Sequence, residues 1–324
     1  MAFTRIPQQY APLGGALPYT AEGGSDATVT LSLADAATGE RIAARRRAGV
    51  ETLTLDAAPA LRRRVRFVPS SGSTGMKPSD DRLAGVVAEA RVEAGTGEPV
   101  VSKAEKRLFL PAVRVVGAPA LLTSMPRERL IAPGECDELT LFTDAACTVT
   151  VTARNGAGEA SRTFPSEEAG LRLFRLDTAD FPGAERLIVD TGACGEVAYT
   201  LVPSAGGCRV AWRSREGSIE HYTFPVEKSE ELRTAKSRVY GSEGYETAGC
   251  DEERRRTLVS AFEPRAVVEA LAELATSPEV WFADAGGYAP ADVVTEKVVV
   301  RRHGAMSALE FEIRPKRKPL RPWY

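Results

Sequence analysis

The sequence predicts a mainly β protein, with two tandem immunoglobulin-like β-sandwich domains followed by a small α+β domain with one helix. Three observations carry this prediction. Apolar and polar residues alternate with period two over many short segments, and turn-forming residues separate those segments at short intervals. One segment alone has the three- and four-residue spacing of an amphipathic helix. Alternation of the first kind is typical of half-buried strands, because successive side chains of a strand point to opposite faces.

The first predicted domain covers residues 1–116. Its first 25 residues are rich in proline and glycine, which indicates an extended N-terminal arm or an irregular lead-in. Glycine-containing turns separate the strands that follow, and their number and spacing predict a β-sandwich between about Ile6 and Val116. The alternating strands are expected near 28–33, 52–55, 65–68, 86–92 and 108–115.

The second predicted domain covers residues 117–205 and begins at a Gly-Ala-Pro linker. Asn155-Gly156 is the dipeptide of a tight hairpin turn. The Cys…Trp…Cys framework of antibody domains is missing, so only the size and rhythm of the strands are immunoglobulin-like. The strands are expected near 139–142, 147–151, 171–174, 187–189 and 197–202.

The third predicted domain covers residues 206–324 and differs in character. Strands at 208–212 and 219–224 predict a hairpin with a short turn. The charged stretch 227–256 indicates an exposed loop or a long β-excursion. Apolar residues at helical spacing predict a helix from Pro264 to Thr276, since proline suits the first turn of a helix.

Composition excludes several classes of function. The 324 residues contain 42 Lys and Arg against 44 Asp and Glu, and a net charge of −2 argues against a dedicated nucleic-acid binder. No apolar run is long enough to span a membrane, and the first residues lack the apolar core of an export signal. Two His and five Cys without a Cys-x-x-Cys pair argue against zinc, so we expect no metal and no cofactor. The cysteines are expected to be reduced, with a Cys136–Cys147 disulfide as the alternative.

No motif indicates catalysis. Residues 72–77 contain the glycines and the lysine of a phosphate-binding loop, but the spacing between these residues does not match that motif. A flexible turn is the better interpretation. His221 lies in an alternating strand and is expected to be structural. The acidic run 251–253 precedes the basic run 254–256, and neutralisation on a solvated surface is favoured over acid–base chemistry. We therefore expect that this protein is not an enzyme. A hydrolase built on a β-scaffold is a further hypothesis, and it would need two carboxylates that converge in a cleft.

Four aromatic residues and one cation are the candidate interface residues. Trp281 and Phe282 are adjacent in a predicted strand, so one of the two rings must face away from the core. Such rings could form a subunit contact or a sugar-binding platform, and core packing is the alternative. The cation belongs to a basic, proline-rich tail that we expect to be exposed. The candidates are Trp212, Tyr222, Phe224, Trp281 and Arg317.

The pattern Trp212-x4-Gly217-x4-Tyr222-Thr223-Phe224 resembles a hairpin of tail proteins in bacteriophages and prophages of gut Bacteroidetes. The segment from Leu271 to Trp281 and the strand 309–313 are similar to the end of those proteins. The opening from Ile6 to Gly14 also resembles this family. The hairpin of that family usually has Asn two residues after the Trp, where this chain has Ser214.

The resemblance implies a virion structural protein of the baseplate, tail tip or tail adaptor, assembled in the bacterial cytoplasm. Its implied partners are other phage tail proteins and further copies of itself, and the resemblance brings no catalytic residues. A carbohydrate-binding or adhesin-type β-sandwich surface protein is the alternative function.

Overall fold

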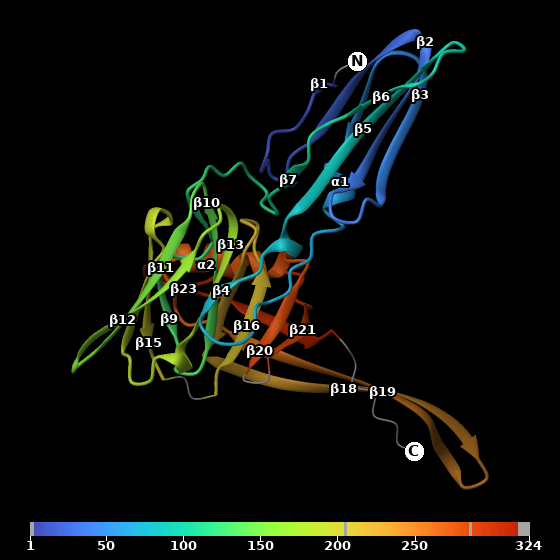
Figure 1. The fold of residues 1–324 in the computed structure, drawn as a ribbon. Coiled ribbons are helices and arrows are strands. Elements are labelled where there is room, and N and C mark those ends of the chain that lie inside the picture. The colour runs from blue at the N-terminus through green and yellow to red at the C-terminus, as the bar shows by residue number, and fades with distance from the viewer. Residues whose placement is uncertain (1–2, 204–205, 285–286, 317–324) are drawn as a thin grey trace.

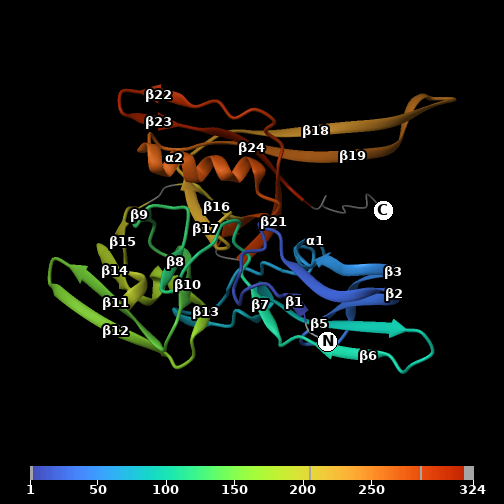
Figure 2. The same ribbon diagram turned by 90° about the horizontal axis from the view of Figure 1, so that it is seen from above.

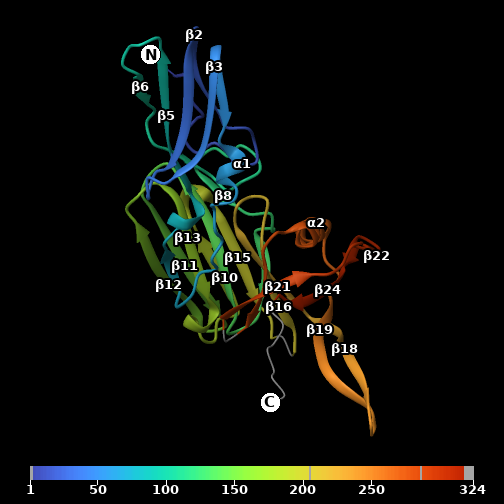
Figure 3. The ribbon, with the colours of Figure 1, turned by 90° about the vertical axis from the view of Figure 1, so that its right-hand side faces the viewer.

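The computed structural model describes residues 3–203, 206–284 and 287–316, and over these residues the protein is mainly β, as predicted. Figure 1 shows an N-terminal sheet in blue to teal, the strands β8 to β15 in green and yellow-green, and the C-terminal strands in gold, orange and red. One long hairpin, β18–β19, extends away from the other elements, and Figures 2 and 3 show it from two further directions.

The N-terminal sheet has six strands. Its strand order is β1-β2-β5-β6, while β3 pairs with the free side of β2 and β7 pairs with β5. A short helix, α1, follows the long β2–β3 hairpin. The elements are β1 (Phe3–Arg5), β2 (Pro18–Asp35), β3 (Arg41–Asp56), α1 (Ala58–Leu61), β5 (Ala84–Ala94), β6 (Val100–Lys103) and β7 (Arg107–Phe109).

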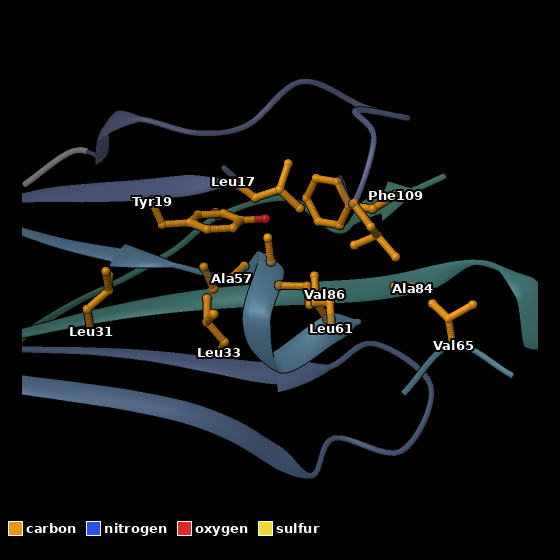
Figure 4. Close-up of a cluster of buried hydrophobic side chains, with 14 of the residues drawn as sticks. Leu17, Tyr19, Leu31, Leu33, Ala57, Leu61, Val65, Ala84, Val86 and Phe109 are labelled. Carbon is orange, nitrogen blue, oxygen red and sulfur yellow. The ribbon is translucent and has the colours of Figure 1, made fainter. Parts of the chain in front are cut away.

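The core of this sheet lies where the alternation predicts it. Leu31, Leu33 and Val86 are fully buried on one face, below α1 (Figure 4). Between β1 and β2 the chain is irregular, which agrees with the expected lead-in. It is not a free extended arm, because Leu17 and Tyr19 are buried in the same core, and Pro18, Gly23 and Gly24 lie within β2.

Two further sheets pack face to face around a shared apolar core. One sheet has the order β4-β13-β10-β8, and the other has the order β12-β11-β14-β15-β9. The predicted Asn155-Gly156 turn joins β11 to β12. The elements are β8 (Ala120–Leu122), β9 (Glu128–Ile131), β10 (Cys136–Thr143), β11 (Cys147–Asn155), β12 (Gly158–Ser166), β13 (Gly170–Asp177), η2 (Thr178–Asp180), β14 (Arg186–Asp190), η3 (Gly192–Cys194) and β15 (Glu196–Leu201).

Strand β4 (Gly75–Lys77) and the turn η1 (Asp80–Arg82) attach the N-terminal part of the chain to this pair of sheets. β4 pairs with β13, although we interpreted this stretch as a flexible turn. Arg82 lies close by, with its Nη2 2.6 Å from Oε1 of Glu138 on β10, and both side chains are buried. An alternating pattern cannot identify a strand of three residues, which explains why the sequence analysis missed it.

The C-terminal sheet has seven strands in the order β17-β16-β20-β21-β24-β19-β18. The predicted hairpin of 208–212 and 219–224 is confirmed as β16 paired with β17. The elements are β16 (Cys208–Arg213), β17 (Ile219–Phe224), β18 (Val226–Gly241), β19 (Gly244–Val259), α2 (Arg265–Ala272), η4 (Glu273–Thr276), β20 (Val280–Asp284), β21 (Gly287–Val293), β22 (Arg301–His303), β23 (Met306–Ala308) and β24 (Glu310–Pro315).

The predicted helix is confirmed, because α2 and η4 together cover residues 265–276 and begin after Pro264. Leu271 and Leu274 are fully buried and lie in one core cluster with Trp212 and Phe311 of the sheet. The helix therefore covers one face of the C-terminal sheet. The opposite face contributes residues such as Trp281 to the core of the N-terminal sheet, so both faces are covered.

The hairpin β18–β19 confirms the predicted long β-excursion. Ion pairs lie along its exposed surface, among them Arg254 with Glu252 at 3.0 Å and Arg254 with Glu230 across the ribbon at 3.7 Å. Exposed pairs of this kind contribute about 0–1 kcal/mol each. Charge neutralisation on a solvated surface was the interpretation that the sequence favoured for this stretch.

Truncation of the buried Trp212 tests the C-terminal core. We expect Trp212→Ala to lower the free energy of unfolding by about 3–5 kcal/mol, because it leaves a cavity between the sheet and α2. Leu232→Ala is the matched control, since Leu232 is 53% exposed on the hairpin and should change stability by less than about 0.5 kcal/mol. Urea unfolding followed by far-UV circular dichroism measures both. Equal midpoints for the two variants would contradict the packing described here.

Candidate functional site

The predicted interface aromatics lie in the interior. Trp212 and Phe224 are fully buried, Trp281 is 8% exposed, and Tyr222 is half-buried beside the same cluster as Trp212. They therefore pack elements of this chain together, as in the core-packing alternative. Arg317 lies outside the described residues. The structure points instead to two other places, a pocket at the root of the long hairpin and the tip of that hairpin.

The pocket lies between β9 and β17, the edge strands of two different sheets. Its volume is about 310 Å³, and we call it the root pocket because it borders Pro225, directly before β18, and Ala261, just after β19. Apolar side chains form most of its wall, and charged side chains line its floor. The lining residues are Met125, Glu128, Arg129, Leu130, Ile131, Ala132, Asp137, Val202, Pro203, Arg209, His221, Tyr222, Thr223, Pro225, Ala261, Glu263 and Val267.

Asp137, at the start of β10, is the centre of the pocket floor. Its Oδ2 accepts a hydrogen bond from Nη1 of Arg129 at 2.9 Å, and its Oδ1 lies 2.9 Å from Nδ1 of His221. All three side chains are almost completely buried. Burial alone would raise the pKa of Asp137, but the charge of Arg129 and the hydrogen bond from His221 outweigh it and hold this pKa well below its ordinary value.

His221 extends the network to the C-terminal sheet. A carboxylate only accepts hydrogen bonds, so Nδ1 of His221 carries the proton towards Asp137 and Nε2 is left to accept one from the Tyr288 hydroxyl at 2.8 Å. The oxygen of Tyr288 lies 3.3 Å from the Cys136 sulfur and accepts from Arg175 at 3.4 Å. His221 therefore has the structural role that the sequence predicts, with both ring nitrogens engaged.

Two further groups complete the buried charges of the floor. Glu220 lies 3.5 Å from Nη2 of Arg129 and accepts a hydrogen bond from Ser218, while burial raises the pKa of its carboxyl group. Arg209 donates to Glu135 at 3.0 Å and to the Thr223 hydroxyl at 2.8 Å. Each buried arginine of the pocket therefore already has a carboxylate partner.

Glu263, at the rim beside α2, differs from these groups. Its Oε1 accepts a hydrogen bond from the Tyr222 hydroxyl at 2.7 Å, and Tyr222 in turn accepts from the backbone N–H of Ala261. Burial, together with the charge of Glu263, raises the pKa of Tyr222. Among the described residues Glu263 has no cation within ion-pair distance. A half-buried carboxylate in an apolar wall can still pair with a positively charged group from outside.

The tip of the hairpin has the opposite character. Lys236, Arg238 and Tyr240 alternate along β18 and so share one face, and Tyr245 lies directly opposite Tyr240 on β19. We call these four residues the tip face. The two tyrosine rings are 73% and 76% exposed and contact each other edge to face, with centroids 5.0 Å apart. Within the described part of the chain neither cation has a carboxylate partner.

Asp137 is held ionised by the charge of Arg129 and by its contact with His221, which suits it to joining elements rather than to proton transfer. All five cysteines are free, so the alternative Cys136–Cys147 disulfide is not formed. Over residues 3–203, 206–284 and 287–316, no cluster of three or more His, Cys, Asp or Glu is placed to hold a metal ion. None of the described helices is long and apolar enough to cross a membrane.

No protein-family model matches the chain, and no curated protein matches it. The solved structures that match include the crystal structure of a tetra-tandem repeat in the extending region of a large adhesion protein. That match has 14% sequence identity and a TM-score of 0.24, and it covers 80% of this chain and 68% of the other. At this TM-score the likeness carries no argument, so we argue function from the residues of this chain.

Replacement of Asp137 tests the pocket floor. We expect Asp137→Asn to lower the free energy of unfolding by about 3–5 kcal/mol, because it leaves Arg129 buried without its closest carboxylate. Glu128→Gln is the matched control, since it removes an exposed pair with Arg186 at 3.1 Å and should cost about 0–1 kcal/mol. Chemical denaturation at pH 7 compares the two variants, and a control as destabilised as Asp137→Asn would count against the network.

The destabilisation caused by Asp137→Asn should depend on pH. The pKa of Asp137 is lowered in the folded protein, whereas an unfolded aspartate titrates near pH 3.9. Its stabilising contribution is therefore fully present above about pH 4 and is lost as the pH falls towards the folded value. The difference in unfolding free energy between the parent protein and Asp137→Asn should stay constant from pH 7 to 5 and narrow below about pH 4. A difference that is unchanged at pH 3 would refute this assignment.

Proposed function

We propose that this chain is a structural component of a phage or prophage tail, in the baseplate, tail-tip or tail-adaptor region, and that it acts in the virion through protein–protein assembly. The observation that carries the proposal is the hairpin β18–β19. Each strand has 16 residues, and β18 is exposed from Val226 to Tyr240. A two-stranded ribbon without a core is marginal on its own in water, so a ribbon of this length favours a partner surface that covers it.

The body that holds the hairpin supports the same proposal. Polar contacts join the C-terminal sheet to the pair of sheets that contains β10, through Asp137 with His221 at 2.9 Å and Arg209 with Glu135 at 3.0 Å. A rigid group of sheets with a projecting hairpin suits a structural subunit that holds neighbouring subunits at defined positions. The resemblance of the β16–β17 hairpin to tail proteins agrees with this function, and its implied partners are other tail proteins and further copies of this chain.

The alternative functions have less support. A carbohydrate-binding or adhesin-type protein would present aromatic rings to a sugar. Trp212, Phe224 and Trp281, the candidates from the sequence, are interior, so this function would have to use other rings such as the exposed Tyr240 and Tyr245 at the hairpin tip. A hydrolase would need two carboxylates free to converge on a substrate, whereas Asp137 is occupied by Arg129 and His221. We therefore also propose that the chain has no catalytic role.

Removal of the projecting part of the hairpin tests assembly. The change replaces residues 232–254 by Asn-Gly, so that Glu231 and Arg255, which are paired in the ribbon, flank a tight turn. We expect the full chain to form oligomers at high concentration and the shortened chain to stay monomeric. Light scattering after size-exclusion chromatography measures the mass, and negative-stain microscopy shows whether closed particles form.

The shortened chain should remain folded, because the deleted residues have no backbone pairing with β24, which pairs with β19 from Arg256 to Val259. The deletion removes one ion pair to β24, between Glu253 and Arg314 at 3.0 Å. An unchanged thermal unfolding midpoint is the control for this. A full chain that is strictly monomeric at high concentration, or a shortened chain that assembles as well as the full chain, would count against the proposal.

A further inference from the structure

We propose that the tip face of one copy binds in the root pocket of a second copy, with Arg238 beside Glu263 and the ring of Tyr240 against the apolar wall. This inference rests on the assembly function proposed above, and it names the surfaces and the partner. The chemistry of the two places is the first argument, and the length of the hairpin is the second.

The root pocket can accept a positively charged group next to an apolar one. Its buried cations, Arg129 and Arg209, both have carboxylate partners within the chain. Glu263 has none in the described residues, so the charge that remains to be paired is negative. Desolvation of a carboxylate is costly unless a cation offsets it, which makes Glu263 selective for a cationic ligand. The apolar wall around it includes Leu130, Val202 and Pro225.

The tip face offers these two groups at adjacent positions of one strand face. Arg238 and Tyr240 are two residues apart on β18, so both side chains point the same way. Arginine and tyrosine are also the residue types that contribute most to protein interfaces, since each combines apolar area with a polar end. Across the ribbon, Tyr245 adds a second exposed ring to the same face.

A hairpin cannot reach the root pocket of its own chain. Tyr240 lies 15 residues beyond Pro225, and at about 3.3 Å per residue the tip stands roughly 50 Å from the root. Figures 1 and 3 show the ribbon extending away from the body beyond its base. The occupant must therefore come from another molecule. A contact of tip to root is heterologous, so repetition gives a ring if the rotation closes and a filament if it does not.

A pocket of about 310 Å³ is at the small end of ligand-binding cavities, which suits one aromatic side chain and part of an arginine. A small cationic amphiphile or the arm of a different tail protein has the same chemistry. These occupants do not require Arg238 of this chain, and the test below separates them from a second copy.

A charge exchange between the two surfaces tests the contact. Arg238→Glu and Glu263→Arg should each weaken self-association about tenfold or more, because each places like charges together. The double variant restores opposite charges and should return to within about threefold of the parent protein. Arg233→Glu is the matched control, since Arg233 is also an exposed hairpin arginine but lies on the other face, beside Glu231 at 2.9 Å. Sedimentation velocity over a concentration series measures the association of all four variants.

Each outcome has a separate meaning. Loss in both single variants with recovery in the double variant supports the tip-to-root contact. An assembling parent protein with unaffected single variants, or a double variant that does not recover, overturns this contact but leaves the assembly function in place. A parent protein that never assembles overturns both. Far-UV circular dichroism of Glu263→Arg checks that the loss of the Tyr222 hydrogen bond has not unfolded the chain, and Glu263→Gln, which only removes the charge, should show a smaller loss in the same direction.

Discussion

The rest of the structure depends on the neutralisation of Asp137. This carboxylate is buried at the start of β10, and its partners come from β9 on one side and from β17 on the other. A buried charge that loses its partner costs several kcal/mol. The sheets that contain β9, β10 and β17 therefore cannot separate at this point without exposing Asp137 to water or leaving a buried charge without a partner. Burial of apolar surface holds the sheets together but is not directional. The ion pairs fix the angle and register at which they meet.

The same principle applies at the other junction. Arg82 and Glu138 connect the segment around β4 to β10, so neighbouring residues of one strand, Asp137 and Glu138, anchor two different parts of the chain. The body of the protein is therefore held by buried contacts, while the ion pairs of the long hairpin are half-buried near its base, as for Arg255 with Glu312, or exposed further out, as for Arg254 with Glu230. Because of this contrast, we expect contacts with other molecules to form at the hairpin and at the root pocket beside its base.

Local patterns predicted the helix and many of the strands, because alternation and helical spacing are properties of neighbouring residues. The strand expected near 65–68 is not formed, and β4 was missed. The patterns identified the strand face on which Leu31 and Leu33 are buried, and they predicted the helix that begins after Pro264. The network was not predictable in this way, since its partners are distant in sequence. One signal was present: Asp137 has the same alternation as Leu139 and Leu141, which are buried. The aromatic candidates were interior because α2 covers one face of their sheet and the N-terminal core covers the other, which no single strand reveals.

The length of the hairpin also makes it a lever. Its two strands join the sheet only near the base, where β19 pairs with β24 from Arg256 to Val259. A change of about 5° in the twist of the sheet at that base would move a tip roughly 50 Å away by about 4 Å. This displacement is nearly the spacing of about 4.8 Å between neighbouring strands of a sheet. Small adjustments in the core beneath the base are thus magnified at the far end. In an assembly, the curvature of the whole particle would be set by side chains that never touch a neighbouring molecule.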